Sequence, residues 1–243
     1  MSEFKMPTEV VELPSKGLVY SEDNPLSSGK VEVKYMTAKE EDILTNQSYI
    51  QKGIVVDKLL QSLIVSKINY DDLIVGDKNA ILVAARILAY GGEYSFTYNG
   101  HSYTIDLTES ESKYIDESKI TKGVNEFEFT LPHSNNTITF KLVNGSDEKK
   151  IDAELKGLKK ISKDASPDLT TRLKYTLTSV NGDREAKTVR NFVDTALLAR
   201  DSRALREYMK QIQPDVLIQF IPEGGDEPIQ APITANFLYP DLD

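Results

Sequence analysis

Residues 186–214, AKTVRNFVDTALLARDSRALREYMKQIQP, carry the longest helical pattern in the chain. Asp201 and Ser202 lie between two runs of apolar residues, and either side chain can cap a new helix, so we expect a bend there. The apolar residues recur at spacings of three and four, which is typical of one buried helix face: Val189, Phe192, Val193, Ala196 and Leu197, then Leu205, Tyr208, Met209 and Ile212. The simplest interpretation is a pair of core helices with a charged outer face.

Further helices are indicated on the N-terminal side of this pair. Thr37 and Glu40 match a capping box, after which a helix should begin. Apolar periodicity predicts two more helices, at residues 54–65 and 78–90, the second ending at Gly91. Residues 146–163 should form a charged helix whose lysine-rich face we interpret as solvated, and residues 167–180 another, with Leu169, Leu173 and Leu177 on one side.

Alternating polar and apolar residues predict the strands. Residues 30–35 should form one strand, and residues 93–107 a hairpin that turns at Asn99 and Gly100. Tyr94, Phe96 and Tyr98 should pair across that hairpin with Tyr103 and Ile105. Two more hairpins are predicted at residues 126–143 and 216–240.

This order of elements predicts an α+β fold, with a helical core, several antiparallel β-hairpins and no doubly wound parallel sheet. We divide the chain into an extended N-terminal arm at residues 1–29 and a strand, helices and first hairpin at residues 30–114. The second hairpin takes residues 115–145, and a helical region follows at residues 146–214. A C-terminal hairpin with an aromatic tail occupies residues 215–243.

Composition excludes several classes of function. The 243 residues carry a formal net charge of −9, which is the wrong sign for a protein that binds nucleic acid through its phosphates. The absence of cysteine excludes disulfides, thiolate zinc sites and a cysteine nucleophile. We find neither a signal peptide nor a stretch near the ~20 apolar residues of a membrane span, so we expect a protein made in a cytoplasm.

No catalytic or ligand-binding motif is evident. His101 and His133 lie in or beside hairpin turns without a second ligand at metal-binding spacing. The glycine pairs at residues 91–92 and 224–225 are explained by helix capping and turning, so no phosphate-binding loop is indicated. We therefore predict a non-enzymatic protein without cofactor or metal. An enzyme acting on a cell wall would need a pair of carboxylates that we do not find.

Three segments together resemble a known family. They are LPSKGLVY at residues 13–20, VEVKYMTAKEEDIL at 31–44, and ALLARDSRALREYMKQIQPD at 196–215 followed by NFLYP at 236–240. The combination resembles the baseplate hub subunits and hub assembly proteins of T-even, T4-like contractile-tailed bacteriophages, over residues 13–240. The resemblance implies a structural or assembly role in the baseplate hub, with other hub and tail proteins as partners. It places the protein in the host cytoplasm during assembly and leaves open its presence in the virion tail.

One functional alternative and one oligomeric state stay open. The chain could be a transient chaperone that shields an apolar segment of another tail protein such as the tape measure, and a homo-oligomer is possible. The arm, the second core helix and the tail supply the candidate partner-binding residues: Leu13, Pro14, Leu18, Tyr20, Arg203, Arg206, Phe237, Leu238, Tyr239 and Pro240. Apolar residues near chain ends dock either on a partner or on their own domain, and both outcomes stay open for the arm and the tail.

Overall fold

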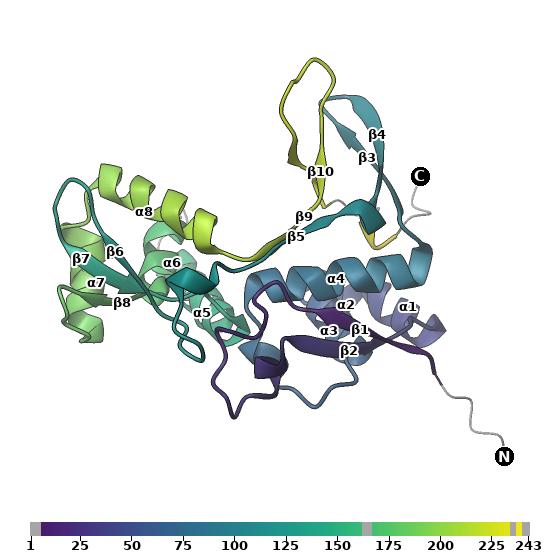
Figure 1. Ribbon diagram of the computed structural model, residues 1–243, viewed down its shortest axis with the longest axis horizontal. Coiled ribbons are helices and arrows are strands. Elements are labelled where there is room, and N and C mark those ends of the chain that lie inside the picture. The colour runs from purple at the N-terminus through teal and green to yellow at the C-terminus, as the bar shows by residue number, and fades with distance from the viewer. Residues whose placement is uncertain (1–5, 162–166, 234–236, 240–243) are drawn as a thin grey trace.

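The computed structural model describes residues 6–161, 167–233 and 237–239. Within these residues it holds eight α-helices and several small sheets whose strand pairs are all antiparallel, which confirms the predicted α+β fold. Figure 1 shows two lobes and a pair of hairpins that stands out from the body. None of the described helices is long and apolar enough to span a membrane.

The N-terminal lobe is built around one long helix. This helix, α4 (Val75–Tyr90), begins three residues before the predicted start and buries Ile81 and Ala85. Strand β2 (Lys30–Lys34) buries Val31 and Val33, as its alternation predicts. The other elements of the lobe are β1 (Thr8–Glu12), α1 (Ala38–Leu44), α2 (Gln47–Gln51) and α3 (Val55–Leu63), with β1 antiparallel to β2.

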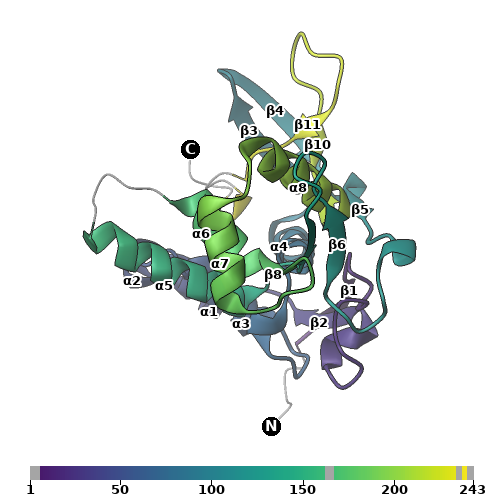
Figure 2. The same cartoon turned by 90° about the vertical axis from the view of Figure 1, so that its left-hand side faces the viewer.

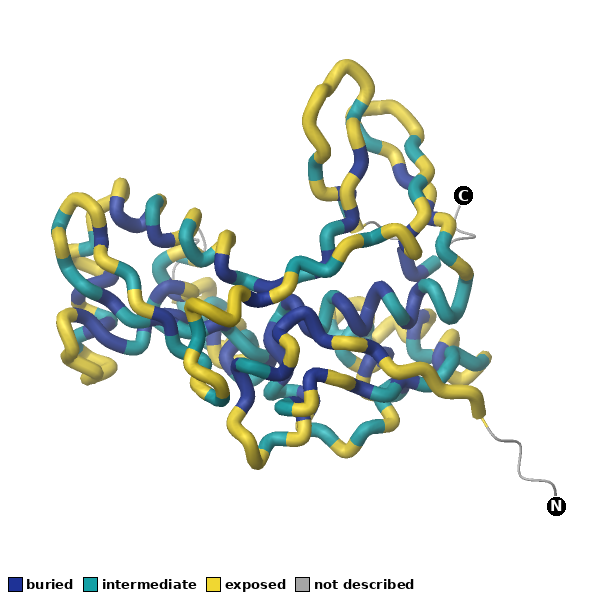
Figure 3. Tube along the Cα trace, viewed as in Figure 1, coloured by how far each residue is buried: buried dark blue, intermediate teal, exposed yellow. Residues whose placement is uncertain are grey.

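The N-terminal arm is packed against α4 through a buried carboxylate. Asp77, in the first turn of α4, accepts hydrogen bonds from Ser15 N (2.9 Å), Ser15 Oγ (2.6 Å) and Tyr20 Oη (2.6 Å). Tyr20 Oη in turn accepts from Ile74 N (3.1 Å), and Asp77 is fully buried. Burial raises the pKa of both Asp77 and Tyr20 above their ordinary values. Figure 3 shows the arm as a mostly buried trace where it crosses α4.

A second buried carboxylate joins β2, α1 and α3. Glu40 accepts from Lys34 Nζ (2.8 Å) and Ser62 Oγ (2.7 Å) at one oxygen, and from Thr37 N (3.0 Å) and Thr37 Oγ1 (2.6 Å) at the other. The predicted capping box is therefore confirmed. Burial alone would raise the pKa of Glu40, but these hydrogen bonds outweigh burial and hold it at about 2.

The C-terminal lobe packs four helices against a three-stranded sheet. The sheet is β6 (Phe127–Thr130), β7 (Thr137–Phe140) and β8 (Leu177–Val180), and the helices are α5 (Gly145–Ile161), α6 (Asp168–Thr176), α7 (Ala186–Thr195) and α8 (Ala199–Ile212). The prediction of one helix over residues 167–180 is wrong for its last turn. Val180 pairs with Ile138 and Leu177 with Phe140, because the edge of β7 offers these residues a ladder that the helix pattern did not indicate.

The predicted bend in the opening stretch lies earlier than expected. Helix α7 ends at Thr195 and α8 begins at Ala199, so the chain turns at residues 196–198. Asp201 and Ser202 lie in the first turn of α8 and do not cap it. The carboxylate of Asp201 accepts instead from His133 N (2.9 Å) and Ser134 N (3.1 Å) in the β6–β7 turn. This contact with a distant turn therefore replaces the capping hydrogen bond that we expected from Asp201.

The projecting hairpins share an aromatic cluster. Tyr94 pairs with Ile105 and Phe96 with Tyr103 across the first hairpin, as predicted, and Phe220 of the second lies with its ring centroid 4.9 Å from that of Phe96. The hairpins are β3 (Glu93–Tyr98) with β4 (His101–Asp106), and β10 (Gln219–Phe220) with β11 (Ile229–Gln230). Asn99 and Gly100 turn the first at φ 49° and 83°, which confirms the expected turn.

A short ribbon joins the lobes. Strand β5 (Glu111–Lys113) pairs with β9 (Asp215–Leu217), a pairing that the sequence did not indicate. Beside it Gly76 meets the chain so closely that a Cβ there would lie 1.8 Å from the carbonyl oxygen of Pro214. Only glycine fits at this contact between α4 and the end of α8. Four 3₁₀ turns complete the described elements, at Pro25–Ser28, Tyr70–Asp72, Leu107–Glu109 and Glu117–Lys119.

The Asp77→Ala variant should lower the free energy of unfolding by about 3 kcal/mol, because three buried donors lose their acceptor. Tyr20→Phe removes one donor and leaves the Ile74 amide without a partner, so it should cost about 1–2 kcal/mol. Urea unfolding measures both, and limited proteolysis should show earlier cleavage in the arm. Asp42→Ala, at an exposed position of α1, is the control. Equal stability of Asp77→Ala and Asp42→Ala would contradict the anchoring role.

Glu40 should contribute stability that is lost in acid. Its folded pKa of about 2 lies below the ordinary 4.5, so the contribution is complete above pH 4.5 and disappears as the pH falls through 2. The stability gap between wild type and Glu40→Gln should therefore shrink by on the order of 3 kcal/mol across that window. Urea unfolding at several pH values measures the gap, with Glu128→Gln at an exposed site as the control for losing one carboxylate. A constant gap for Glu40→Gln would refute the assignment.

Candidate partner-binding site

Two cavities lie on either side of the C-terminal half of α8. The smaller has a volume of about 340 Å³ and the larger about 720 Å³. Arg206, Met209 and Gln213 line both cavities, so one face of the helix separates them. We call the two cavities together the α8 groove. Both volumes lie in the range of protein binding pockets.

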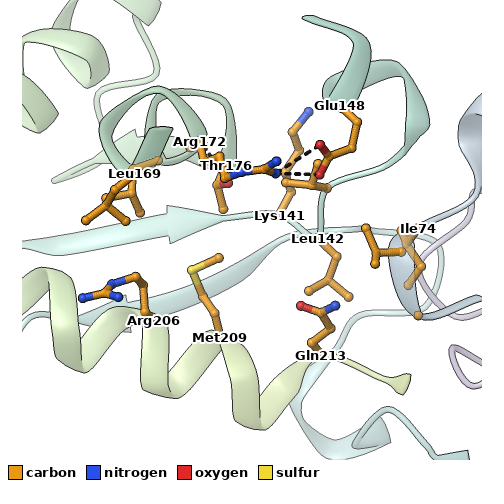
Figure 4. A pocket seen from close by; sticks show the side chains of 14 residues that line it. Ile74, Lys141, Leu142, Glu148, Leu169, Arg172, Thr176, Arg206, Met209 and Gln213 are labelled. Carbon is orange, nitrogen blue, oxygen red and sulfur yellow. Dashed lines mark hydrogen bonds and ion pairs between the residues drawn. The ribbon is translucent and has the colours of Figure 1, made fainter. Parts of the chain in front are cut away.

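The smaller cavity has an apolar floor. Leu142 and Leu173 are buried there, while Leu169, on α6, is 44% exposed at the rim. Figure 4 shows Met209 extending from α8 toward Leu142 and α6, with Arg206 and Gln213 on the same helix to either side. The residues come from α4, the segment after β7, α5, α6 and α8, so both lobes contribute to it.

Most charges around the smaller cavity are neutralised within the chain. Arg172 forms ion pairs with Glu148 (2.8 Å) and Asp168 (3.1 Å), and the hydrogen bond that it donates to Glu148 raises the pKa of Arg172. Lys141 pairs with Asp147 at 2.7 Å. Arg206 differs from these two cations. Among the described residues, its Nε donates a hydrogen bond to the carbonyl oxygen of Ser202 (3.3 Å) and not to a carboxylate. Its charge is therefore available at the cavity mouth.

The larger cavity lies between α8, β9 and β11 and is also basic. Its lining has three cationic side chains, Lys113, Arg206 and Lys210, and one carboxylate, that of Asp215. Asp215 accepts from Asn79 Nδ2 (2.9 Å), and Lys113 Nζ donates to the carbonyl oxygen of Lys210 (2.5 Å). Burial lowers the pKa of Lys113. Among the described residues, none of these three cations forms an ion pair with a carboxylate.

The position of α8 is fixed from the opposite side. Leu205 is fully buried, and the rings of Phe129 and Tyr208 stack with centroids 4.6 Å apart. Asp201 holds the β6–β7 turn by accepting hydrogen bonds from two backbone amides. Burial alone would raise the pKa of this carboxyl, but the hydrogen bonds from Ser134 and His133 lower it. The helix is thus anchored by its first turn and by one face, and the face with Arg206 and Met209 stays accessible.

The predicted residues of the arm lie within the protein's own core. Leu13, Pro14 and Tyr20 are buried and Leu18 is half-buried. This placement corresponds to docking on the chain's own domain, one of the two outcomes left open by the sequence. A partner would reach these side chains only if the arm detached from α4.

The predicted residues of the tail also face inward where they are described. Phe237 is fully buried, with its ring edge-on to Tyr94 at 5.1 Å, and Leu238 is 8% exposed. The hydroxyl of Tyr239 donates to the carbonyl oxygen of Leu44. Pro240 lies outside the described residues.

The predicted arginines lie on α8 and differ in their surroundings. Arg203 is exposed and pairs with Glu207 (3.0 Å) away from both cavities, whereas Arg206 lines both. The sequence analysis did not identify the other lining residues, such as Leu169, Met209 and Gln213, as parts of a site. The spacing of Arg206, Met209 and Gln213 by three and four was the available signal, since it places them on one helix face.

The groove offers binding chemistry: an apolar floor with unneutralised cations at its edge. Within the described residues no three His, Cys, Asp or Glu side chains gather in a way that would hold a metal ion. His101 pairs with Glu223 (2.7 Å) in the projecting hairpins, and the backbone of His133 bonds to Asp201. Neither histidine lines the groove.

Asp201→Ala should release the β6–β7 turn and lower the free energy of unfolding by about 2 kcal/mol, because two backbone donors lose their acceptor. Asp201→Asn keeps one acceptor oxygen and should cost less. Amide hydrogen exchange should become faster at His133 and Ser134 in the alanine variant. Unchanged exchange at these two amides would show that Asp201 does not hold the turn.

Comparison with known proteins gives no relative for this chain. No protein-family model, no curated protein and no solved structure matches it. The resemblance of residues 13–240 to phage baseplate hub proteins therefore stays a prediction from the sequence.

Proposed function

We propose that this chain acts by binding other proteins, as a non-enzymatic subunit or assembly factor of a contractile phage tail baseplate hub. The observation that carries the binding role is the α8 groove, where an apolar floor opens beside Arg206, whose guanidinium has no carboxylate partner among the described residues. The baseplate assignment rests on the resemblance of the segments at residues 13–20, 31–44 and 196–215, the last followed by residues 236–240.

The composition of the groove supports a protein as the partner. Arginine and methionine are enriched at protein interfaces, and both lie side by side on α8 as Arg206 and Met209. The two cavities continue on both sides of the helix, so the accessible surface is elongated rather than a single enclosed pocket. Such a surface suits a peptide segment or a helix better than a small molecule.

A transient tail chaperone is the second candidate. The half-exposed Leu169 and the apolar floor beside it would suit the holding of an apolar segment until assembly is complete. The two candidates differ in stoichiometry, because a subunit stays in the finished tail and a chaperone does not.

Mass spectrometry of purified phage tails and of the infected-cell lysate tests the role directly. A subunit should occur in tails at a fixed ratio to other hub proteins, and an assembly factor should be abundant in the lysate and missing from tails. In both cases hub or tail proteins should co-purify with the chain from the lysate. Absence of any tail protein from the purified complex would refute the proposed function.

Arg206→Glu should weaken that co-purification by about tenfold or more, because a reversed charge would face the partner at the centre of the groove. Arg203→Glu is the matched control, since Arg203 is exposed on the same helix and lies outside both cavities. Quantitative mass spectrometry of the captured complex measures both variants. Equal loss in the two variants would show that general charge, and not the groove, governs binding.

A further inference from the structure

The loop between β10 and β11 carries the chemistry that the α8 groove lacks. Residues 221–228 read IPEGGDEP, and Glu223, Asp226 and Glu227 are all exposed. Ile221 is 59% exposed beside them. The chain contains no lysine or arginine after Lys210, so this end of the sequence is uniformly acidic.

The groove is basic on a chain of opposite net charge. Lys141 and Arg172 are neutralised by ion pairs, and the lining residues that remain are the cations Lys113, Arg206 and Lys210 against the carboxylate of Asp215, on a protein of net charge −9. Arg206 and Lys210 are exposed and lack an ion-pair partner among the described residues. Charge is therefore segregated between two separate surfaces of the same molecule.

We propose that the α8 groove receives the β10–β11 loop of a second copy of this chain. Asp226 and Glu227 would face Arg206 and Lys210, and Ile221 would enter the apolar part of the groove beside Met209. Opposite charges on the two surfaces steer the copies together, and burial of the isoleucine adds an apolar contact.

The loop of the same copy does not occupy this position. Residues 221–227 line neither cavity, although Pro228 and Ile229 at the base of the hairpin border the larger one. Figures 1 and 2 both show the loop standing out from the body, with its tip away from α8. The aromatic cluster and the bond from Glu223 N to Tyr103 Oη (2.9 Å) hold its base, so the acidic tip is presented outward.

The contact joins two different surfaces of the chain. Two copies that exchange loops about a twofold axis fill both grooves and form a closed dimer, whereas a single contact leaves one free groove and one free loop, so that association continues until a ring closes or a chain grows. Self-association of this kind goes beyond the proposed function, because it needs no other tail protein.

Sedimentation velocity of the purified full chain over a range of concentrations tests the proposal. Wild type should form species larger than a monomer, and high salt should weaken them because the surface charges are screened. Arg206→Glu/Lys210→Glu and Asp226→Lys/Glu227→Lys should each weaken self-association at least about tenfold. All four positions are exposed, and circular dichroism checks that the fold is kept.

Two further samples make the test specific. The chain that carries all four substitutions should regain self-association, because the charges are then exchanged between loop and groove. Lys156→Glu/Lys159→Glu is the matched control, since it makes the same change of charge on an exposed face of α5 and should associate as wild type does.

A monomeric wild type at every concentration overturns the proposal, and so does a fourfold variant that stays as weak as the double variants. If wild type is monomeric while Arg206→Glu loses its tail partners, the groove binds a segment of a different protein and only this inference fails. If wild type associates as described but no tail protein co-purifies, the proposed function fails and this inference stands.

Discussion

A carboxylate held away from water at the start of α4 is the constraint on which the rest of the structure depends. Burial of Asp77 is unfavourable unless its oxygens are hydrogen-bonded, and the donors come from Ser15 and Tyr20 in the arm. The arm must therefore lie across α4, which brings β1 alongside β2. The other side of the same helix contacts Pro214 at Gly76, and this contact places α8 and its groove. One satisfied acidic group thus links the first residues of the chain to the candidate site.

Local signals in the sequence were sufficient for much of the fold. The turn at Asn99 and Gly100, the capping box at Thr37 and the glycine after Tyr90 each depend on a few adjacent residues, and the structure has all three. Long-range pairing decided the rest. Residues 177–180 join β7 because a strand edge is present there, and Asp201 bonds to a distant turn instead of capping its own helix. Neither partner can be read from the neighbouring sequence.

The candidate site could be predicted only in part, for a related physical reason. The sequence does not distinguish apolar side chains that bind a partner from those that fill a core. In the structure, Leu13 and Phe237 fill the core. Arg206 was among the predicted partner-binding residues, and it lines both cavities. Its neighbours in the groove come from elements far apart in the chain, among them Leu169 and Ile229. A cavity assembled in this way has no contiguous sequence signature.

The β5–β9 ribbon makes one cavity of the α8 groove depend on a pairing between distant residues. It pairs Glu111 with Leu217, so it closes a long stretch of chain, whereas a hairpin such as β6–β7 joins residues that are close in sequence. Contacts between distant residues are slow to form, because the chain must first lose the entropy of a large loop. The larger cavity needs β9 and β11 beside α8, so it exists only once the ribbon has closed. A copy in which the ribbon is open would therefore lack the larger cavity.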